Sequence, residues 1–165
     1  MAPSMESQTS SLPDLCLLIR QRDVTRLRRA LEDHPTLIQQ QRWSGVTGLH
    51  RAVSEGDVEI AQLLLSYGAD ANQRSSWGWY SPLHLACKAG SEEMIWLLLN
   101  HGANWNLPDK AKKTPLQWAV RAGKASIAYR IDQQLHAKAK LALQQAREQQ
   151  TNANKSPLTF AKLCG

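Results

Sequence analysis

The sequence lacks the features that mark a disulfide-stabilised secreted domain or a membrane protein. Its three cysteines, Cys16, Cys87 and Cys164, have no regular spacing and cannot all pair with one another. The longest apolar runs, residues 15–19 and 95–99, fall far short of the ~18 residues that a membrane span requires. Cysteines used in this way predict reduced thiols and a cytoplasmic or nuclear location.

Motifs of the common enzyme and metal sites are also missing. There is no G-x-x-x-x-G-K-[S/T] phosphate loop, no G-x-G-x-x-G dinucleotide loop and no G-x-S-x-G nucleophile turn. Cysteines never occur as C-x-x-C, and no two histidines stand four residues apart around a glutamate. We therefore predict a protein that is not an enzyme, and assign no catalytic residue, metal ligand or cofactor.

The net charge of +6 is unevenly distributed along the chain. Residues 1–42 carry six basic and five acidic side chains, residues 43–109 three and seven, and residues 110–165 eleven and two. The last third is therefore cationic. Such a segment suits an acidic protein surface, nucleic acid or anionic lipid, or it only solvates a long polar helix. Residues 1–11 are polar, show no secretory-signal pattern and are expected to form a flexible tail.

A ten-residue pattern occurs three times, at residues 47–56 (TGLHRAVSEG), 81–90 (SPLHLACKAG) and 114–123 (TPLQWAVRAG). Ser81 and Thr114 stand where a helix N-cap is needed, and proline follows each at the first helical position. A glycine ends each copy, where a left-handed residue stops the helix. These helices are expected to pack against their partners through one small residue each: Ala52, Ala86 and Ala119.

A second helix is predicted at residues 58–65 and 93–99, before the Gly-Ala pairs at residues 68–69 and 102–103. A period of 33 to 34 residues with a T-P-L-H opening resembles the ankyrin repeat. The resemblance implies an all-α solenoid of paired antiparallel helices with projecting hairpin loops. It also implies that His50 and His84 hydrogen-bond to neighbouring backbone and steady the hairpins.

Residues 12–136 are predicted to form about four repeats, the first of which is a degenerate cap. Its helices are expected at residues 15–19 and 24–31, with Arg22 where a glycine would stand. Terminal repeats are atypical because one face meets water instead of a neighbour. We expect that solvated face to carry the arginines of this repeat: Arg20, Arg22, Arg26, Arg28 and Arg29.

The fourth repeat lacks a signal to end its second helix, because Leu135 stands where Gly68 and Gly102 stand in the preceding repeats. Strong helix formers continue to about residue 150, so we predict unbroken helix from about residue 126 to beyond residue 142. Residues 137–155 are then a helical extension and linker. Residues 156–165 (SPLTFAKLCG) resemble either the start of a fifth repeat, which we favour, or the elongin-binding helix of a SOCS box.

The segment between the second and third repeats contains an unusual aromatic cluster. Trp77, Trp79 and Tyr80 lie within four positions of a polar loop that is one residue longer than the family spacing, and Trp79 takes the place of the usual hairpin glycine. Exposed aromatic clusters often mark a recognition surface. The alternative is that Trp77 or Trp79 folds over the adjacent loop.

The resemblance implies a scaffold or adaptor that binds another protein through the concave face and loop tips of the array. The partner is predicted to offer apolar pockets beside acidic side chains, since the contact positions are aromatic first and basic second. Alternatives are a substrate-receptor subunit of a ubiquitin ligase, or nucleic-acid binding through the basic C-terminal third. Nucleic acid is not favoured, because the aromatic cluster at residues 77–80 lies outside that third; no membrane binding is predicted. The predicted partner-binding residues are Trp43, Ser44, Trp77, Trp79, Tyr80, Lys88, Lys110, Lys112, Lys113 and Arg121.

Overall fold

The computed structural model describes residues 14–41 and 44–153, with side chains to residue 149. The chain divides into two compact units, residues 1–125 and residues 126–165. Within the described residues the regular structure is helical, apart from one isolated antiparallel bridge between Gln41 and Thr47. The protein is therefore all-α, as predicted.

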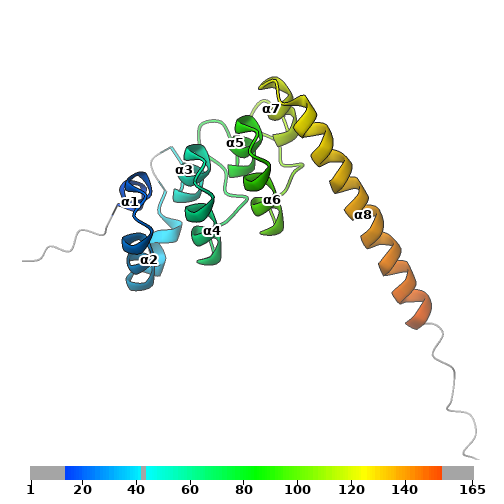
Figure 1. The fold of residues 1–165 in the computed structure, drawn as a ribbon, viewed down its shortest axis with the longest axis horizontal. Helices are drawn as coiled ribbons and strands as arrows, with labels where there is room; N and C mark the ends of the chain where they lie inside the picture. Colours follow the sequence, from blue (N-terminus) through cyan, green and yellow to red (C-terminus); the bar gives the residue numbers. More distant parts are fainter. Residues whose placement is uncertain (1–13, 42–43, 154–165) are drawn as a thin grey trace, which may run out of the picture. The chain divides into compact units, whose positions relative to one another are not determined.

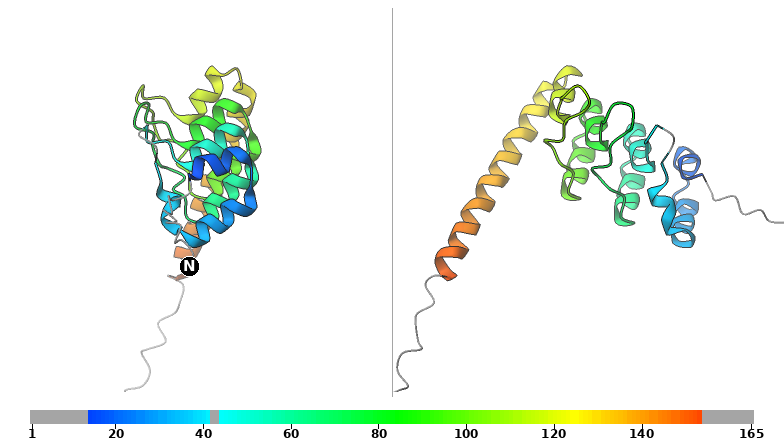
Figure 2. Two further views of the ribbon diagram at one scale, coloured as in Figure 1. Left: turned by 90° about the vertical axis from the view of Figure 1, so that its left-hand side faces the viewer. Right: turned by 180° about the vertical axis from the view of Figure 1, so that it is seen from behind.

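The first unit is a row of helix pairs (Figure 1). The pairs are α1 (Leu15–Gln21) with α2 (Val24–Asp33), α3 (Gly48–Glu55) with α4 (Val58–Ser66), and α5 (Pro82–Ala89) with α6 (Glu92–Asn100). A 3-10 helix, η1 (Pro35–Gln39), follows α2, and α7 (Pro115–Arg121) opens the next copy. α1, α3, α5 and α7 form one layer and α2, α4 and α6 the other, while the connecting loops project to one side (Figure 2).

The first helices α3, α5 and α7 begin at the predicted N-caps, and α3 and α5 also end at the predicted glycines. Thr47, Ser81 and Thr114 are the N-caps of α3, α5 and α7, and each has extended backbone. Gly90 ends α5 with a φ of 77°, in the left-handed region that glycine adopts without steric cost. α7 ends one residue before its glycine, at the C-cap Ala122.

Small and aliphatic side chains fill the space between the helices. Ala52, Ala86 and Ala119 are at most 1% exposed, which confirms that they sit in the close helix contacts. Aliphatic residues around them are completely buried, among them Leu64 and Leu98. Because a fully buried leucine contributes roughly 1.5–3 kcal/mol, this repeated pattern is the main source of stability in the stack.

The first repeat is joined to the second through Arg22. This residue stands where a glycine was expected, and it ends α1 in the left-handed conformation with a φ of 55°. Its side chain does more than meet water, however, because Nε lies 2.7 Å from Oδ2 of the buried Asp57. Asp57 is also the N-cap of α4 and accepts from the N–H of Ile60. Arg22 is exposed, like the other arginines of this repeat, and in addition it links the first repeat to the second.

The second unit contains the long helix α8 (Ala125–Ala153). The helix runs through Leu135 without a break, which confirms the prediction of continuous helix beyond residue 142. Leu141 and Leu143 are more than half exposed on it. No helix in the described part of the chain is both long and apolar enough to cross a membrane. The predictions for residues 1–11 and 156–165 lie outside the described residues.

Candidate protein-binding surface

Two loops of the first unit lie side by side at the edge of the helical layers. We refer to residues 73–80 as the tryptophan loop and to residues 107–113 as the lysine loop. The N–H of Lys110 donates to the carbonyl of Gly78 at 3.0 Å, and the Arg74 guanidinium donates to the carbonyl of Pro108. These two bonds join the loops directly to each other.

The tryptophan loop is closed by its own backbone. The N–H of Ser75 donates to the carbonyl of Tyr80 at 3.0 Å, and the N–H of Trp79 donates to the carbonyl of Ser75 at 3.1 Å. Trp79 has a φ of 55°, a left-handed conformation that is unusual for a tryptophan. Its assignment to the hairpin glycine position is thus confirmed. The equivalent residue of the preceding repeat is Gly45, with a φ of 70°.

The lysine loop has the same closing bonds. The N–H of Asp109 donates to the carbonyl of Lys113 at 2.9 Å, and the N–H of Lys112 donates to the carbonyl of Asp109 at 3.0 Å. Lys112 takes the left-handed position with a φ of 59°. Both loops therefore present one non-glycine residue at a position where glycine is the ordinary choice.

Each loop is also bound by a histidine from the repeat before it. Nε2 of His50 lies 3.2 Å from the carbonyl of Tyr80, and Nε2 of His84 lies 3.1 Å from the carbonyl of Lys113. At the other ring nitrogen, Nδ1 accepts from the N–H of Thr47 or Ser81. Because one nitrogen faces a donor and the other an acceptor, each ring is neutral with its proton on Nε2. The predicted role of both histidines is confirmed.

Burial reinforces the neutral state of both rings. Desolvation lowers the pKa of His50 from 6.5 to about 4, although its bond to the Tyr80 carbonyl opposes the shift. Desolvation likewise lowers the pKa of His84, against its bond to Lys113. Protonation would place a second donor opposite the N–H of Thr47 or Ser81, where an acceptor is needed. The hydrogen bonds from His50 and His84 to the loop of the next repeat, called forward bonds below, are therefore sensitive to acid.

The tip of the tryptophan loop carries two exposed indoles. Trp77 is 67% exposed and Trp79 is 50% exposed, values far above those of core aromatics. The guanidinium of Arg74 lies 5.4 Å from the centre of the Trp79 ring and its Nε donates to the Trp79 carbonyl. Arg74 therefore holds the Trp79 side chain in place without burying it.

Tyr80 points away from this tip. Its half-buried ring lies 5.8 Å, centre to centre, from both His50 and Trp118. The centre of the His84 ring lies 5.2 Å from that of the Trp118 ring in an edge-to-face arrangement. The three aromatic residues of the loop therefore lie in two different environments. Trp77 and Trp79 are exposed to solvent, whereas Tyr80 belongs to a row of contacting rings, the aromatic row, formed by His50, Tyr80, Trp118 and His84.

The buried side chain of Asp109 connects the lysine loop to α7 through hydrogen bonds. Its Oδ1 accepts from the N–H of Lys113 at 2.7 Å and its Oδ2 from the indole N–H of Trp118 at 2.9 Å. Burial raises the pKa of Asp109, but the hydrogen bonds from Lys113, Trp118 and Ala111 together outweigh burial and lower it. The carboxylate is therefore ionised. Neither Asp109 nor Trp118 was among the predicted site residues, although both stand at fixed distances from the N-cap Thr114.

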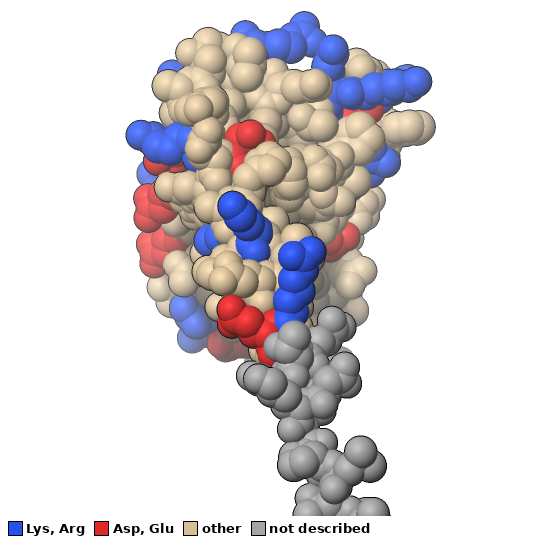
Figure 3. Space-filling view, turned by 90° about the vertical axis from the view of Figure 1, so that its right-hand side faces the viewer, with Lys and Arg blue, Asp and Glu red and all other residues tan. Residues whose placement is uncertain are grey.

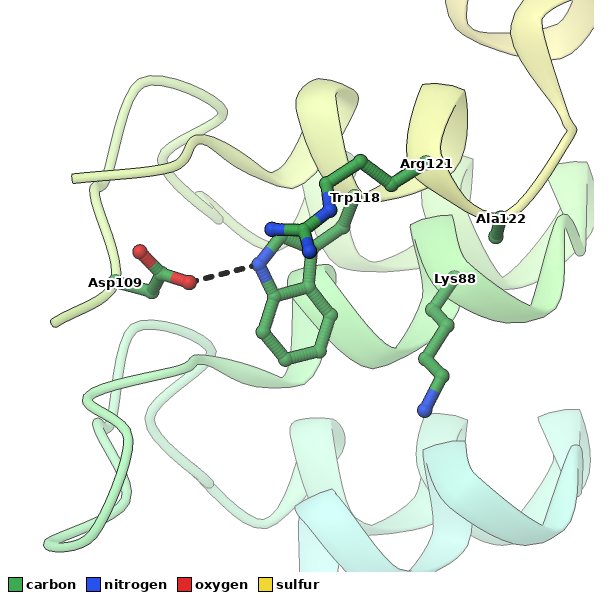
Figure 4. Close-up of a pocket in the computed structure, with 5 residues that line it drawn as sticks. All are labelled: Lys88, Asp109, Trp118, Arg121 and Ala122. Carbon is green, nitrogen blue, oxygen red and sulfur yellow. Dashed lines mark hydrogen bonds between the residues drawn. The ribbon is translucent and has the colours of Figure 1, made fainter. Parts of the chain in front are cut away.

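The remaining predicted residues fall in three places. Lys88 and Arg121 project from α5 and α7 into an open cavity that Asp109, Trp118 and Ala122 also line (Figure 4). Lys110 and Lys112 are exposed on the lysine loop, where Lys113 is half-buried. The carbonyl of Ser44 accepts from the N–H of Ser76, which joins the turn before α3 to the tryptophan loop. Trp43 lies outside the described residues.

Two observations on the described residues concern metal binding and cysteine chemistry. No group of three or more His, Cys, Asp or Glu side chains there could hold a metal ion. Burial raises the pKa of the Cys87 thiol to about 12, so this cysteine is not a nucleophile at neutral pH. The surface instead offers exposed indoles, cations and a small open cavity.

Paired helices in two layers, with loops bound to the next repeat, define a helical-repeat solenoid. A family model described as "Ankyrin repeats (3 copies)" matches residues 49–140, more than half of the chain. The chain belongs to the ankyrin-repeat family. Ankyrin repeats generally act as non-catalytic modules that bind other proteins. No curated protein shows significant sequence similarity to the chain.

Proposed function

We propose that this protein is an adaptor that binds a partner protein through the tryptophan loop, the lysine loop and the adjoining ends of α5 and α7. The observation that carries the proposal is the pair of exposed indoles at Trp77 and Trp79. Their loop is braced by Arg74 and by the bond from Lys110, so the indoles lie on an ordered backbone. Ordered, solvent-facing tryptophans are typical anchors of a protein interface.

The charges beside the indoles favour a partner with acidic side chains. Lys110, Lys112 and Lys113 lie on the lysine loop, which is hydrogen-bonded to Gly78 of the tryptophan loop, and Lys88 and Arg121 lie on α5 and α7. This surface fits a partner that has apolar pockets to receive the indoles and carboxylates around those pockets. The pattern of cysteines supports a cytoplasmic or nuclear location for the complex.

Two other functions have less support. Single-strand nucleic-acid binding combines stacking aromatic residues with a basic surface, whereas here the exposed indoles lie on the tryptophan loop and eleven of the 20 Lys and Arg residues lie in residues 110–165. Figure 3 shows Lys and Arg side chains gathered at the top of its face, with Asp and Glu side chains among those lower down. A substrate-receptor role in a ubiquitin ligase depends on residues 156–165, which lie outside the described residues. Neither function explains the two exposed indoles as directly as protein binding does.

The decisive test distinguishes the contribution of the Trp79 indole to binding from that of the Trp79 backbone conformation. Partner proteins are captured from cell lysate on the wild-type chain, and dissociation is then measured for wild type, Trp79→Ala and Trp79→Gly. Both substitutions should speed dissociation roughly 30-fold, since a buried tryptophan anchor is worth about 2 kcal/mol. Glycine suits the φ of 55°, so its failure to restore binding would show that the ring itself makes the contact.

A matched control is Tyr129→Ala, which removes an aromatic ring that is 67% exposed on α8. This variant should bind like wild type. A partner that binds Trp79→Ala as tightly as wild type would contradict the proposed surface. The convex helices or α8 would then be the better candidates.

The lysines of the lysine loop should act mainly on association. Changing Lys110, Lys112 and Lys113 together to alanine should slow association more at low salt than at high salt, because exposed charges steer encounter and are screened. The control changes Lys124, Lys140 and Arg147 to alanine, which removes the same charge elsewhere. Equal slowing in both triple variants would show a general charge effect and not a local one.

A further inference from the structure

The cavity beside the lysine loop has the size and exposure of a site for one side chain. It measures about 290 Å³ and lies between α5, α7 and Asp109, with the Trp118 indole as its aromatic wall (Figure 4). Pockets for small molecules and cofactors mostly start at about 300 Å³ and are largely enclosed. Here Lys88 and Arg121 are exposed at the edge, so a group carried by a partner can enter from solvent.

The two cations of the cavity come from equivalent positions in neighbouring repeats. Lys88 is the seventh residue after the N-cap of α5, and Arg121 is the seventh after the N-cap of α7. The two helices pack side by side, which places their axes roughly 8–10 Å apart. The long side chains can therefore reach a common group between them. The equivalent residue on α3 is the neutral Ser54, so the cation pair is confined to this cavity.

Neither cation is neutralised within the described part of the protein. Lys88 and Arg121 form no hydrogen bond or ion pair with another described residue. The nearby carboxylate of Asp109 is engaged by the Lys113 N–H and the Trp118 indole. Asp109 thereby fixes the Trp118 ring, and its own charge lowers the charge of the cavity from +2 to +1.

We propose that this cavity binds one aspartate or glutamate side chain of the partner protein. The carboxylate lies between Lys88 and Arg121, and its methylene stem contacts the Trp118 indole. This inference rests on the proposed function and names the chemistry of the partner at one position. The cavity charge of +1 matches a monoanion. A phosphate group, at −1.5 to −2, would exceed that charge and meet the Asp109 carboxylate.

The test uses a displayed library of random 12-residue peptides, selected at low salt on the full chain. Selection is repeated on Lys88→Ala/Arg121→Ala and on the control Lys124→Ala/Lys140→Ala, which has the same net charge. Wild type and control should enrich peptides with an acidic residue, and the cavity variant should lose this preference. A selected peptide should bind the cavity variant about five- to tenfold more weakly, as expected for two partly exposed charge pairs.

Two further measurements locate the carboxylate and identify it. The NMR signal of the Trp118 indole N–H should shift when the peptide binds wild type, and much less when its acidic residue is changed to Gln or Asn. Replacing that residue with phosphoserine should not tighten binding. Tighter binding of the phosphopeptide by tenfold or more would overturn the assignment to a carboxylate.

The outcomes separate this inference from the proposed function. Peptides that bind wild type and Lys88→Ala/Arg121→Ala equally, but lose affinity for Trp79→Ala, would overturn the carboxylate site and leave the protein-binding surface intact. Peptides that bind all of these variants equally would overturn both. Failure to enrich any peptide on wild type would also count against both.

Discussion

The tryptophan loop and the lysine loop are closed by equivalent backbone hydrogen bonds. They differ at the buried residue that begins this closure, whose side chain accepts hydrogen bonds in the lysine loop but not in the tryptophan loop. In the lysine loop, Asp109 accepts from the Lys113 N–H and from the Trp118 indole. In the tryptophan loop the equivalent residue is Ser75, which is 1% exposed. The Oγ of Ser75 has no hydrogen-bond partner among the described residues.

This difference shows which parts of a projecting loop are needed for its shape. The left-handed residue and the forward bond from a histidine occur in both loops. The buried carboxylate does not, and the tryptophan loop, with its extra residue, keeps the same closure without it. The common bonds therefore set the fold of the loop, while the buried side chain and the tip residues are free to differ.

Acidification should have the largest effect on stability, and it should act on both loops. The folded protein keeps His50 neutral down to its pKa of about 4, whereas the unfolded chain takes up a proton near pH 6.5. The stability that depends on neutral His50 is therefore complete above pH 6.5. It falls by roughly 3 kcal/mol as the pH drops to 4, and His84 adds a loss in the same direction. Urea unfolding at pH 7 and pH 4 measures this change.

The chain itself supplies the control for that experiment. In α7 the position of His50 is taken by Gln117, whose Oε1 accepts from the N–H of Thr114 at 3.2 Å. His50→Gln should keep the cap bond and remove the His50 part of the acid sensitivity, leaving that of His84. If wild type and His50→Gln lost equal stability between pH 7 and pH 4, the assigned role of His50 would be wrong.

Removing the carboxylate of the lysine loop should have the next largest effect. Asp109→Ala leaves the Lys113 N–H and the Trp118 indole N–H without their acceptor, at a cost of about 2 kcal/mol. The midpoint of urea unfolding and the fluorescence of Trp118 report the loss. A midpoint equal to that of wild type would show that the lysine loop, like the tryptophan loop, does not need its buried side chain.

The two left-handed residues should respond differently to glycine. Lys112→Gly removes steric strain and should stabilise the protein by up to about 1 kcal/mol. Trp79→Gly removes the same strain but also the contact between Arg74 and the indole, worth about 0.5–1 kcal/mol, so its net effect should be near zero. Thermal unfolding of both variants tests the comparison; equal shifts would mean that the Arg74 contact contributes nothing.

The smallest effect is expected at Ser75. Ser75→Ala removes a buried hydroxyl that has no partner among the described residues, so the stability should change by less than about 0.5 kcal/mol, or rise slightly. The measurement is the urea midpoint, with Asp109→Ala examined in parallel. A loss near that of Asp109→Ala would reveal a hidden partner for the Ser75 hydroxyl and remove the difference between the loops.

The sequence was sufficient for the helices because their signals are local. N-caps, prolines and glycines within ten residues placed α3, α5 and α7, and the leucine at Leu135 predicted the continuous α8. The place of Trp79 at the hairpin glycine position was also predicted from the repeat register, and its left-handed backbone agrees with that position. Such inferences need only the preferences of single residues and the period of the repeat.

The candidate site was predicted less completely because it depends on contacts between loops. The contact of Arg74 with Pro108 joins residues 34 positions apart, and no local pattern reveals it. Tyr80 follows Trp79 in sequence, but its ring joins the aromatic row beneath the loops because the left-handed residue redirects the chain. The hydrogen bond between Asp109 and Trp118 could not be predicted, because the sequence does not reveal that the lysine loop folds back onto α7.

The forward bonds of His50 and His84 have a consequence for how the array unfolds. Each joins one repeat to the loop of the next, so the folded state of a repeat depends on that of its neighbour. The opening of a loop and the loss of the helix pair before it should therefore be one cooperative event. A partner that holds the tryptophan and lysine loops together would couple two such events, and hydrogen exchange in α3 and α5 would then slow together, including in α3, which is outside the proposed binding surface.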